Sequence, residues 1–264
     1  MKNRMKEILH NMQKYNSTDM AFQTFGLDSS VLYDALIVAP GWKPTKLLDD
    51  KAFKVTVLTA HSYISGYLVE RDDLKIAWIQ ISSSASNLID HLAICAELKF
   101  KKLIFIGAVG ALKEGIEIGD LYTPSYSVSG VFANTYLKDK LSDFVLFEKV
   151  YPQMSFVDNV IALADDCGIK LKKAAVFCTD SIALEYSHLD KIKSFDTDLI
   201  EMETSSFYLM ADLLEIPAIA LLVVSDNSAV SNPLIGRNEE LNLKYNNGRK
   251  KLIPELIFNI CKQL

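Results

Sequence analysis

Two short segments hold acidic residues where carboxyl groups can do chemistry. Glu201 and Glu203 flank Met202 just before a helix-like segment, and Asp226 comes just after the fully apolar run Ala218–Val224. A carboxylate accepts two hydroxyl hydrogen bonds at once, which suits the diol of a ribose, and a methionine beside it supplies a soft apolar face for the sugar. A carboxyl group at the mouth of a buried strand has a raised pKa and can protonate a leaving group.

The same residues also have a plain structural interpretation. Glu201 and Glu203 precede a helix, where acidic side chains are commonly favourable partners of the helix dipole. Asp226 and Asn227 together are also typical of an Asx turn or a helix cap. The residue types alone leave both interpretations open.

A pair of glycines follows the apolar run Leu103–Ile106. Gly107 and Gly110 permit either close approach of the backbone to a ligand or a tight turn between a strand and a helix. Their GxxG spacing differs from the GxGxxG of dinucleotide sites, so an oxidoreductase that binds NAD is a disfavoured class.

The elements that must position these residues follow from apolar runs that alternate with helical patterns. The predicted strands are Ala35–Ala39, Val55–Ala60, Gly66–Val69, Ile76–Ile81, Leu103–Ile106, a region from Asp120–Pro124 onward, Lys173–Cys178 and Ala218–Val224. The predicted helices are 4–15, Asn87–Leu98, Asp158–Cys167, Thr204–Leu214 and part of Leu241–Leu264. Continuous apolar strands separated by helices indicate a sheet covered on both faces. We therefore expect one α/β domain over residues 1–264, a three-layer αβα sandwich with the N-terminal helix as an extension.

Three predicted strands end in small or polar residues. These ends are Pro40-Gly41-Trp42-Lys43, Gly107–Ala111 and Ser225–Asn227. In open α/β sheets, ligands gather outside the carboxyl ends of the strands. We therefore expect the three ends to face one pocket.

Composition excludes several other classes of protein. A formal net charge of −5 argues against nucleic-acid binding. The four cysteines form no CxxC pair and the four histidines show no ligand spacing, so no metal site is expected. No apolar stretch reaches the roughly 18 residues that span a bilayer, and no signal peptide is visible, so we expect a soluble cytoplasmic protein.

In combination, these segments resemble the nucleoside phosphorylase superfamily, which contains purine nucleoside phosphorylases, uridine phosphorylases and methylthioadenosine/adenosylhomocysteine nucleosidases. The resemblance rests first on IEMETSSFY (Ile200–Tyr208) and on the later strand that ends in SDN (Ser225–Asn227). Further segments fit in the same order along the chain, namely Leu36–Gly41, Leu103–Leu112, Ile118–Tyr122 and Phe177–Ile182.

The resemblance implies a mixed, partly barrel-like central sheet and a homo-oligomer (trimer, hexamer or dimer). It also implies that Glu203 holds the ribose hydroxyls, that Met202 packs under the sugar and that Asp226 donates a proton to purine N7. The remaining substrate-binding residues that it implies are Glu201, Val109, Gly110, Phe177, Ile182 and Asn227. The expected ligand is a small-molecule nucleoside, with no cofactor and with phosphate as co-substrate for a phosphorylase.

The chain departs from the family where phosphate would bind. The family clamps phosphate with arginines, because a guanidinium gives a permanent, two-pronged charge. Here the first glycine turn has no arginine, Phe105 stands at the second arginine position, and Thr59 stands near the third. The candidate phosphate-binding set is therefore reduced to Gly41, Lys43, Lys46 and Ala108. The glutamate with which the nucleosidase branch activates water, near the first glycine turn, has no counterpart either.

Our prediction from sequence is a purine nucleoside phosphorylase-like enzyme that converts a nucleoside into free base and sugar 1-phosphate. One alternative is a phosphate-independent hydrolase, with Glu201 or Asp180 as its base. Another is a nucleoside-binding homologue that has lost catalysis. The segment Ser125–Tyr151 is poorly periodic, and it and the N-terminal helix are candidates for an interface or a lid.

Overall fold

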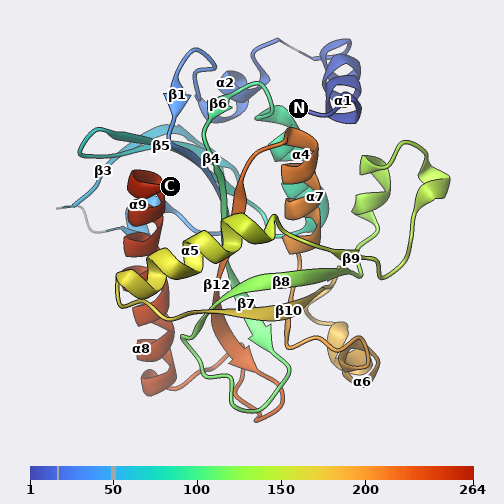
Figure 1. Ribbon diagram of the computed structural model, residues 1–264, viewed down its shortest axis with the longest axis vertical. Coiled ribbons are helices and arrows are strands. Elements are labelled where there is room, and N and C mark those ends of the chain that lie inside the picture. Colours follow the sequence, from blue (N-terminus) through green and yellow to red (C-terminus); the bar gives the residue numbers. More distant parts are fainter. Residues whose placement is uncertain (17, 49–51) are drawn as a thin grey trace.

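The computed structural model describes residues 1–16, 18–48 and 52–264. A mixed sheet forms its centre (Figure 1). Along this sheet the strands are ordered β11 (Leu199–Glu201), β10 (Leu171–Cys178), β8 (Leu121–Ser129), β12 (Ala218–Asn227), β7 (Leu103–Ala111), β2 (Ala35–Pro40), β5 (Leu74–Ile81), β4 (Ser65–Arg71) and β3 (Lys54–Ala60). Beside this path, β9 (Lys149–Val150) pairs with β8, and β1 (Leu32–Tyr33) forms a separate parallel pair with β6 (Lys99–Phe100).

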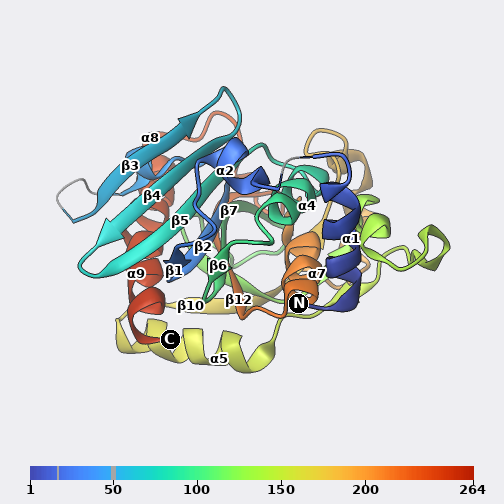
Figure 2. The ribbon, with the colours of Figure 1, turned by 90° about the horizontal axis from the view of Figure 1, so that it is seen from above.

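Part of this sheet closes on itself. β11 pairs with β10, and it also pairs with β7 through Leu199 opposite Ala111 and Ile200 opposite Gly110. Within the described residues, β11, β10, β8, β12 and β7 therefore form a ring, while β2, β5, β4 and β3 extend from it as an open wing (Figure 2). The predicted mixed α/β fold with a partly barrel-like sheet is confirmed.

Helices cover the sheet on two sides (Figures 1 and 2). One group consists of α1 (Asn3–Gln13), α4 (Ala85–Ile94) and α7 (Thr204–Leu214), which pack on one another. The other consists of α5 (Met154–Asp166), α8 (Glu239–Asn247) and α9 (Ile253–Gln263), with the π-helical segment Gly248–Leu252 joining the last two. Short helical segments complete the chain, namely α2 (Met20–Phe25), α3 (Pro44–Leu47), α6 (Leu189–Lys193) and 3-10 turns at Ala133–Leu137, Leu141–Asp143 and Glu185–His188.

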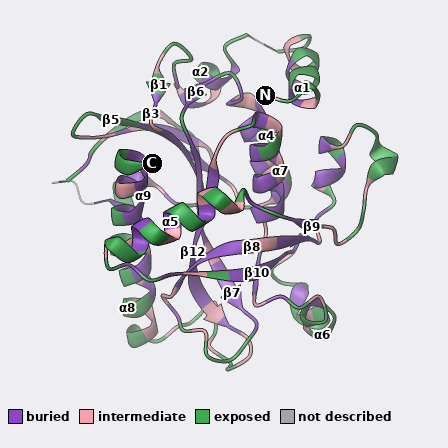
Figure 3. Cartoon of the chain, in the orientation of Figure 1, coloured by how far each residue is buried: buried purple, intermediate pink, exposed green. Residues whose placement is uncertain are grey.

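Burial follows the apolar patterns of the sequence. All residues of β2 are buried, as is the run Ala218–Val224 of β12, because both strands lie inside the helical cover (Figure 3). α9 buries Ile253, Leu256, Ile257 and Ile260, the i, i+3, i+4, i+7 spacing of an amphipathic helix. In the described part of the chain, no helix is both long and apolar enough to cross a membrane.

The N-terminal helix is part of this cover. It was predicted over residues 4–15 and is observed as α1, Asn3–Gln13. Met5 and Leu9 are buried on the face where α1 meets α4 and α7. The helix therefore packs on the folded core.

Two predicted strand ends are wrong, because both strands continue. β7 does not turn at Gly107 but runs to Ala111, and β12 runs past Val224 to Asn227. Their mutual pairing and the β7–β11 pairing satisfy the backbone groups of these extra residues, which local patterns do not reveal. Likewise, 125–129 belong to β8 rather than to the poorly periodic segment that begins at Ser125.

Candidate active site

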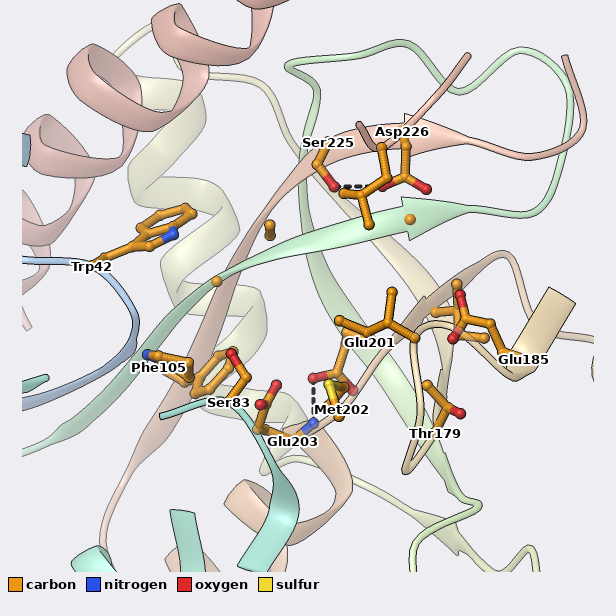
Figure 4. A pocket seen from close by; sticks show the side chains of 17 residues that line it. Trp42, Ser83, Phe105, Thr179, Glu185, Glu201, Met202, Glu203, Ser225 and Asp226 are labelled. Atoms are coloured by element: carbon orange, nitrogen blue, oxygen red, sulfur yellow. Dashed lines mark hydrogen bonds between the residues drawn. The ribbon is translucent and has the colours of Figure 1, made fainter. Parts of the chain in front are cut away.

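A pocket lies where the carboxyl ends of β2, β5, β7 and β12 meet (Figure 4). These four strands run parallel to one another, so their ends share one edge of the sheet. The pocket is lined by Pro40, Trp42, Ser83, Phe105, Gly107, Ala108, Gly110, Thr179, Ile182, Glu185, Ile200, Glu201, Met202, Glu203, Ser225, Asp226 and Leu234. The three strand ends expected to face one pocket therefore do so.

Glu203 is a buried carboxylate with an unpartnered oxygen. It immediately precedes α7, its side chain is only 5% exposed, and Oε1 has no hydrogen-bond partner in the described chain. Burial raises the pKa of Glu203 well above its usual range, and the charge of Glu201 adds to this, while the Ser84 backbone N–H acts in the opposite direction. An unpaired buried carboxylate oxygen is costly, so this position favours a ligand that donates a hydrogen bond.

Glu201, two residues earlier, is in the opposite situation. Its Oε2 accepts hydrogen bonds from the backbone N–H groups of Glu203 at 2.7 Å and Thr204 at 2.9 Å. Its Oε1 accepts from the Thr204 hydroxyl at 2.7 Å and from the Cys178 thiol at 2.8 Å. The carboxylate therefore binds the first turn of α7 and has no free oxygen to offer a ligand.

A β-bulge positions Asp226. Val224 pairs with Val109 and Asp226 pairs with Gly110, so Ser225 is an extra residue in β12. The Ser225 hydroxyl donates to Asp226 Oδ1 at 2.6 Å. Burial raises the pKa of Asp226, against the opposing effects of that hydrogen bond and of the Arg237 charge. Among the described residues Oδ2 has no such partner, so the proton of a neutral Asp226 is available there.

Gly110 makes room for this carboxyl group. A Cβ at position 110 would lie 3.0 Å from Asp226 Oδ2 and 3.1 Å from Ile200 Cγ2. Both distances are tighter than ordinary van der Waals contacts, and strands flank β7 on both sides at this point. At Gly110 the absence of a side chain thus gives room to Asp226 and Ile200, whereas the sequence analysis expected a ligand or a tight turn.

Glu185 is a fourth pocket carboxyl, and the sequence analysis did not find it. It lies in the 3-10 turn Glu185–His188 and is only 9% exposed. Burial, followed by the neighbouring charge of Asp226, raises the pKa of Glu185 from the ordinary 4.5 to about 7. A single acidic residue in an irregular segment has no pattern that could have marked it.

The sequence analysis also did not identify Arg237, which contacts the backbone next to Asp226 from outside the pocket lining. Its Nη1 donates to the Ser225 carbonyl at 2.9 Å and to the Leu234 carbonyl at 3.0 Å. The guanidinium also lies 4.6 Å from the centre of the Tyr245 ring. These contacts hold a positive charge near Asp226 without bringing Arg237 to the pocket wall.

The pocket has two unlike ends (Figure 4). We call Asp226, Glu185 and Thr179 the base end, and Trp42, Phe105 and Ser83 the aromatic end; Met202 and Glu203 lie between them. Among the described residues that line the pocket there is no lysine, arginine or histidine. The Arg249 guanidinium lies 4.8 Å from the centre of the Trp42 ring but is not itself part of the lining.

Several predicted site residues lie outside the pocket lining. Gly41 and Lys46 are exposed, and half-buried Lys43 immediately precedes the short helix α3. Val109 and Phe177 are buried, the latter against the rings of Phe147 and Phe195. The Asn227 amide donates to the carbonyls of Lys113 and Ile116, both at 2.9 Å. The structure thus separates these six residues from Asp226, Glu201, Met202, Glu203, Gly110, Ile182 and Ala108, which do line the pocket.

The two bases suggested for hydrolysis are both engaged. Glu201 is saturated as described, and Asp180 Oδ2 accepts a hydrogen bond from the Phe132 N–H at 3.3 Å and lies outside the lining. In the described part of the chain, no three or more His, Cys, Asp or Glu side chains gather so as to hold a metal ion.

Sequence comparison identifies the family. The model of the Phosphorylase superfamily matches residues 56–250, and the chain belongs to this family. An aminodeoxyfutalosine nucleosidase of Campylobacter jejuni is 28% identical over 157 residues, which are 58% of this chain and 66% of that protein. A DeoD-type purine nucleoside phosphorylase of Brevibacillus brevis is 28% identical over 133 residues, which are 48% of this chain and 52% of that protein. The chain thus aligns with about half to two thirds of the length of these distant homologues.

Solved structures share the fold. A uridine phosphorylase of Vibrio fischeri has a TM-score of 0.73 at 15% identity, with 90% of this chain and 95% of that chain covered. A purine nucleoside phosphorylase of Toxoplasma gondii has a TM-score of 0.71 at 16% identity, with coverages of 89% and 92%. A methylthioadenosine/adenosylhomocysteine nucleosidase of Campylobacter jejuni has a TM-score of 0.66 at 18% identity, with coverages of 87% and 99%.

Proposed function

We propose that the protein hydrolyses the N-glycosidic bond of a purine nucleoside without phosphate. The observation that carries this proposal is the charge of the pocket wall. Four carboxyl groups line it, those of Glu185, Glu201, Glu203 and Asp226, and no cationic side chain among the described residues accompanies them.

Electrostatics favours water over phosphate as the attacking group. Two like unit charges about 5 Å apart repel by about 3 kcal/mol at an effective dielectric constant of about 20. A phosphate in this pocket would meet carboxylates without a paired cation, and Phe105 and Trp42 supply rings where a phosphate needs donors. Water has no charge and needs only hydrogen-bond partners, which Ser83 and Glu203 offer.

The remaining roles follow from the sugar and base chemistry. Glu203 Oε1 accepts a ribose hydroxyl, and Met202 supplies an apolar surface under the sugar. As the glycosidic bond breaks, its electron pair leaves with the base, and Asp226 Oδ2 delivers the proton that neutralises it. Water then adds to the cationic sugar carbon, and its proton passes to Glu203, the carboxylate beside Ser83 in Figure 4.

Phosphorolysis is the second candidate, as the sequence analysis predicts. It is favoured by the 28% identity to a DeoD-type purine nucleoside phosphorylase. The positive charge that it requires would then come from outside the described pocket wall, because Lys43 and Lys46 do not contribute to it.

The test is base release from a panel of purine and pyrimidine nucleosides, with and without phosphate. We expect equal rates in both conditions and free reducing sugar as the second product. An Asp226→Asn variant, purified in the same way, reveals any contaminating host enzyme. Phosphate-dependent release with formation of sugar 1-phosphate would overturn the proposal, and nucleoside binding without any release would contradict both catalytic candidates.

A further inference from the structure

Glu185 is the pocket carboxyl that the proposed reaction does not use. Its side chain is about nine-tenths buried and lines the pocket, but its carboxyl group accepts no hydrogen bond from the described part of the chain. It comes from a 3-10 turn, whereas Asp226 comes from β12, so two distant segments bring two carboxyl groups to one end of the pocket (Figure 4).

A carboxyl group that faces the pocket without a partner in the described chain is open to a ligand. The carboxyl oxygens of Glu185 are not among the fully buried oxygens that lack a partner, so they are accessible from the pocket and can accept a hydrogen bond from a ligand donor there. Glu185 lies with Asp226 at the base end, across the pocket from Trp42 and Ser83. The part of a nucleoside that reaches this end is the base.

We propose that Glu185 determines base specificity by accepting a hydrogen bond from the exocyclic amino group of a 6-aminopurine, beside the contact between Asp226 and N7. This inference rests on the proposed function, because it requires the base of a nucleoside to lie at the base end. The substrate class that it selects is adenine nucleosides over hypoxanthine nucleosides.

The choice follows from the purine edge next to N7. Adenine presents an amino donor there, whereas hypoxanthine and guanine present an oxo acceptor. An ionised carboxylate only accepts hydrogen bonds, so it pairs with the amino group and repels the oxygen. A protonated Glu185 could donate instead, and then the oxo purine becomes acceptable.

The preference therefore depends on pH. Asp226 is the charged group that acts on Glu185, and Tyr186 follows Glu185 in the chain; Glu201 and Glu203 line the same pocket, and the charge of Arg237 acts on Asp226. Burial, followed by the charge of Asp226, brings the pKa of Glu185 to about 7. We expect the preference for adenosine over inosine to rise as the pH passes upward through this value.

The experiment measures kcat/KM for adenosine and for inosine below and above pH 7. In the parent protein the ratio should rise with pH and reach about tenfold or more in favour of adenosine. In Glu185→Gln the ratio should stay near one at every pH, because an amide both donates and accepts. The matched control is Asp190→Asn, which makes the same chemical change at an exposed carboxyl of α6.

The ratio separates this inference from the proposed reaction. Both nucleosides are attacked by the same molecule, water or phosphate, so the ratio of their kcat/KM values has the same meaning for hydrolysis and for phosphorolysis. If neither nucleoside is cleaved, the relative affinities for free adenine and hypoxanthine, measured by calorimetry, test the same contact without turnover. A ratio that is independent of pH in the parent, or unchanged in Glu185→Gln, would overturn the proposal.

Discussion

The base end and the aromatic end of the pocket differ in how many hydrogen-bonding groups they leave without a protein partner. At the base end, Asp226 Oδ2 and the Glu185 carboxyl make no hydrogen bond within the described residues and so have spare hydrogen-bonding capacity. At the aromatic end, Trp42 and Phe105 present rings, with Ser83 beside them. One end offers free carboxyl groups, and the other offers mainly apolar surface.

Under the proposed function, this difference places recognition of the base and entry of the attacking molecule at different ends of the pocket. Strand pairing and a bulge orient Asp226, the carboxyl group proposed to protonate the base. The attacking molecule is proposed to enter at the aromatic end, where Trp42 and Phe105 supply apolar surface and no cationic side chain lines the described pocket wall. A change at one end therefore need not disturb the other.

The largest effect is expected from Asp226→Asn at the base end. An amide cannot deliver the proton that the departing base requires, so kcat should fall about a thousandfold. Nucleoside affinity, measured by calorimetry, should change much less, because Glu203 and Met202 still contact the sugar. Turnover within about tenfold of the parent would remove Asp226 from the role of general acid.

Glu201 and Glu203 offer a second contrast, within one short segment. Glu201→Ala should lower the free energy of unfolding by about 3 kcal/mol, because it leaves the buried N–H groups of Glu203 and Thr204 without their acceptor. Glu203→Gln should leave stability unchanged or raise it, since it removes a buried charge with an unpaired oxygen, while nucleoside binding weakens. Urea unfolding of both variants checks this, and equal losses of stability would contradict the division of roles.

The base end should also make stability depend on pH. The pKa of Glu185 rises from 4.5 to about 7 on folding, so between these values the folded state holds the proton more tightly than the unfolded state. Stability contributed by this group is therefore present at low pH and decreases by about 2 kcal/mol from pH 5 to pH 7. Urea unfolding at several pH values should show a smaller decrease in Glu185→Gln, and parallel curves would show that Glu185 titrates normally.

Gly110→Ala is expected to give the smallest effect. The added methyl group would lie 3.0 Å from Asp226 Oδ2, so the carboxyl group must shift by a few tenths of an ångström. A displacement of that size in a catalytic group should reduce kcat/KM about tenfold while the protein still folds. Ala108→Gly, on the same strand of the pocket wall, is the control, and equal effects of both changes would point to a general disturbance of β7.

Much of the fold could be predicted from the sequence. Apolar runs such as Ala35–Ala39 and Ala218–Val224 marked the strands, and the i, i+3, i+4 spacing marked the helices, because each element must bury its own apolar face. Glu203, Met202 and Asp226 were found for a similarly local reason, since each lies directly beside a strongly patterned element and within a segment resembling the family.

The tertiary structure alone decided which of these residues are free to act. Glu201 and Glu203 look equivalent in the sequence, yet a thiol from β10 and the start of α7 saturate one and leave Oε1 of the other without a partner. Glu185 lines the pocket, whereas Lys43 and Lys46 do not. These positions are set by short or irregular segments, whose sequences have no periodic pattern from which a position could be predicted. Local pattern encodes the burial of an element, whereas the partners of a single carboxyl group depend on closure of the sheet, which brings distant segments together.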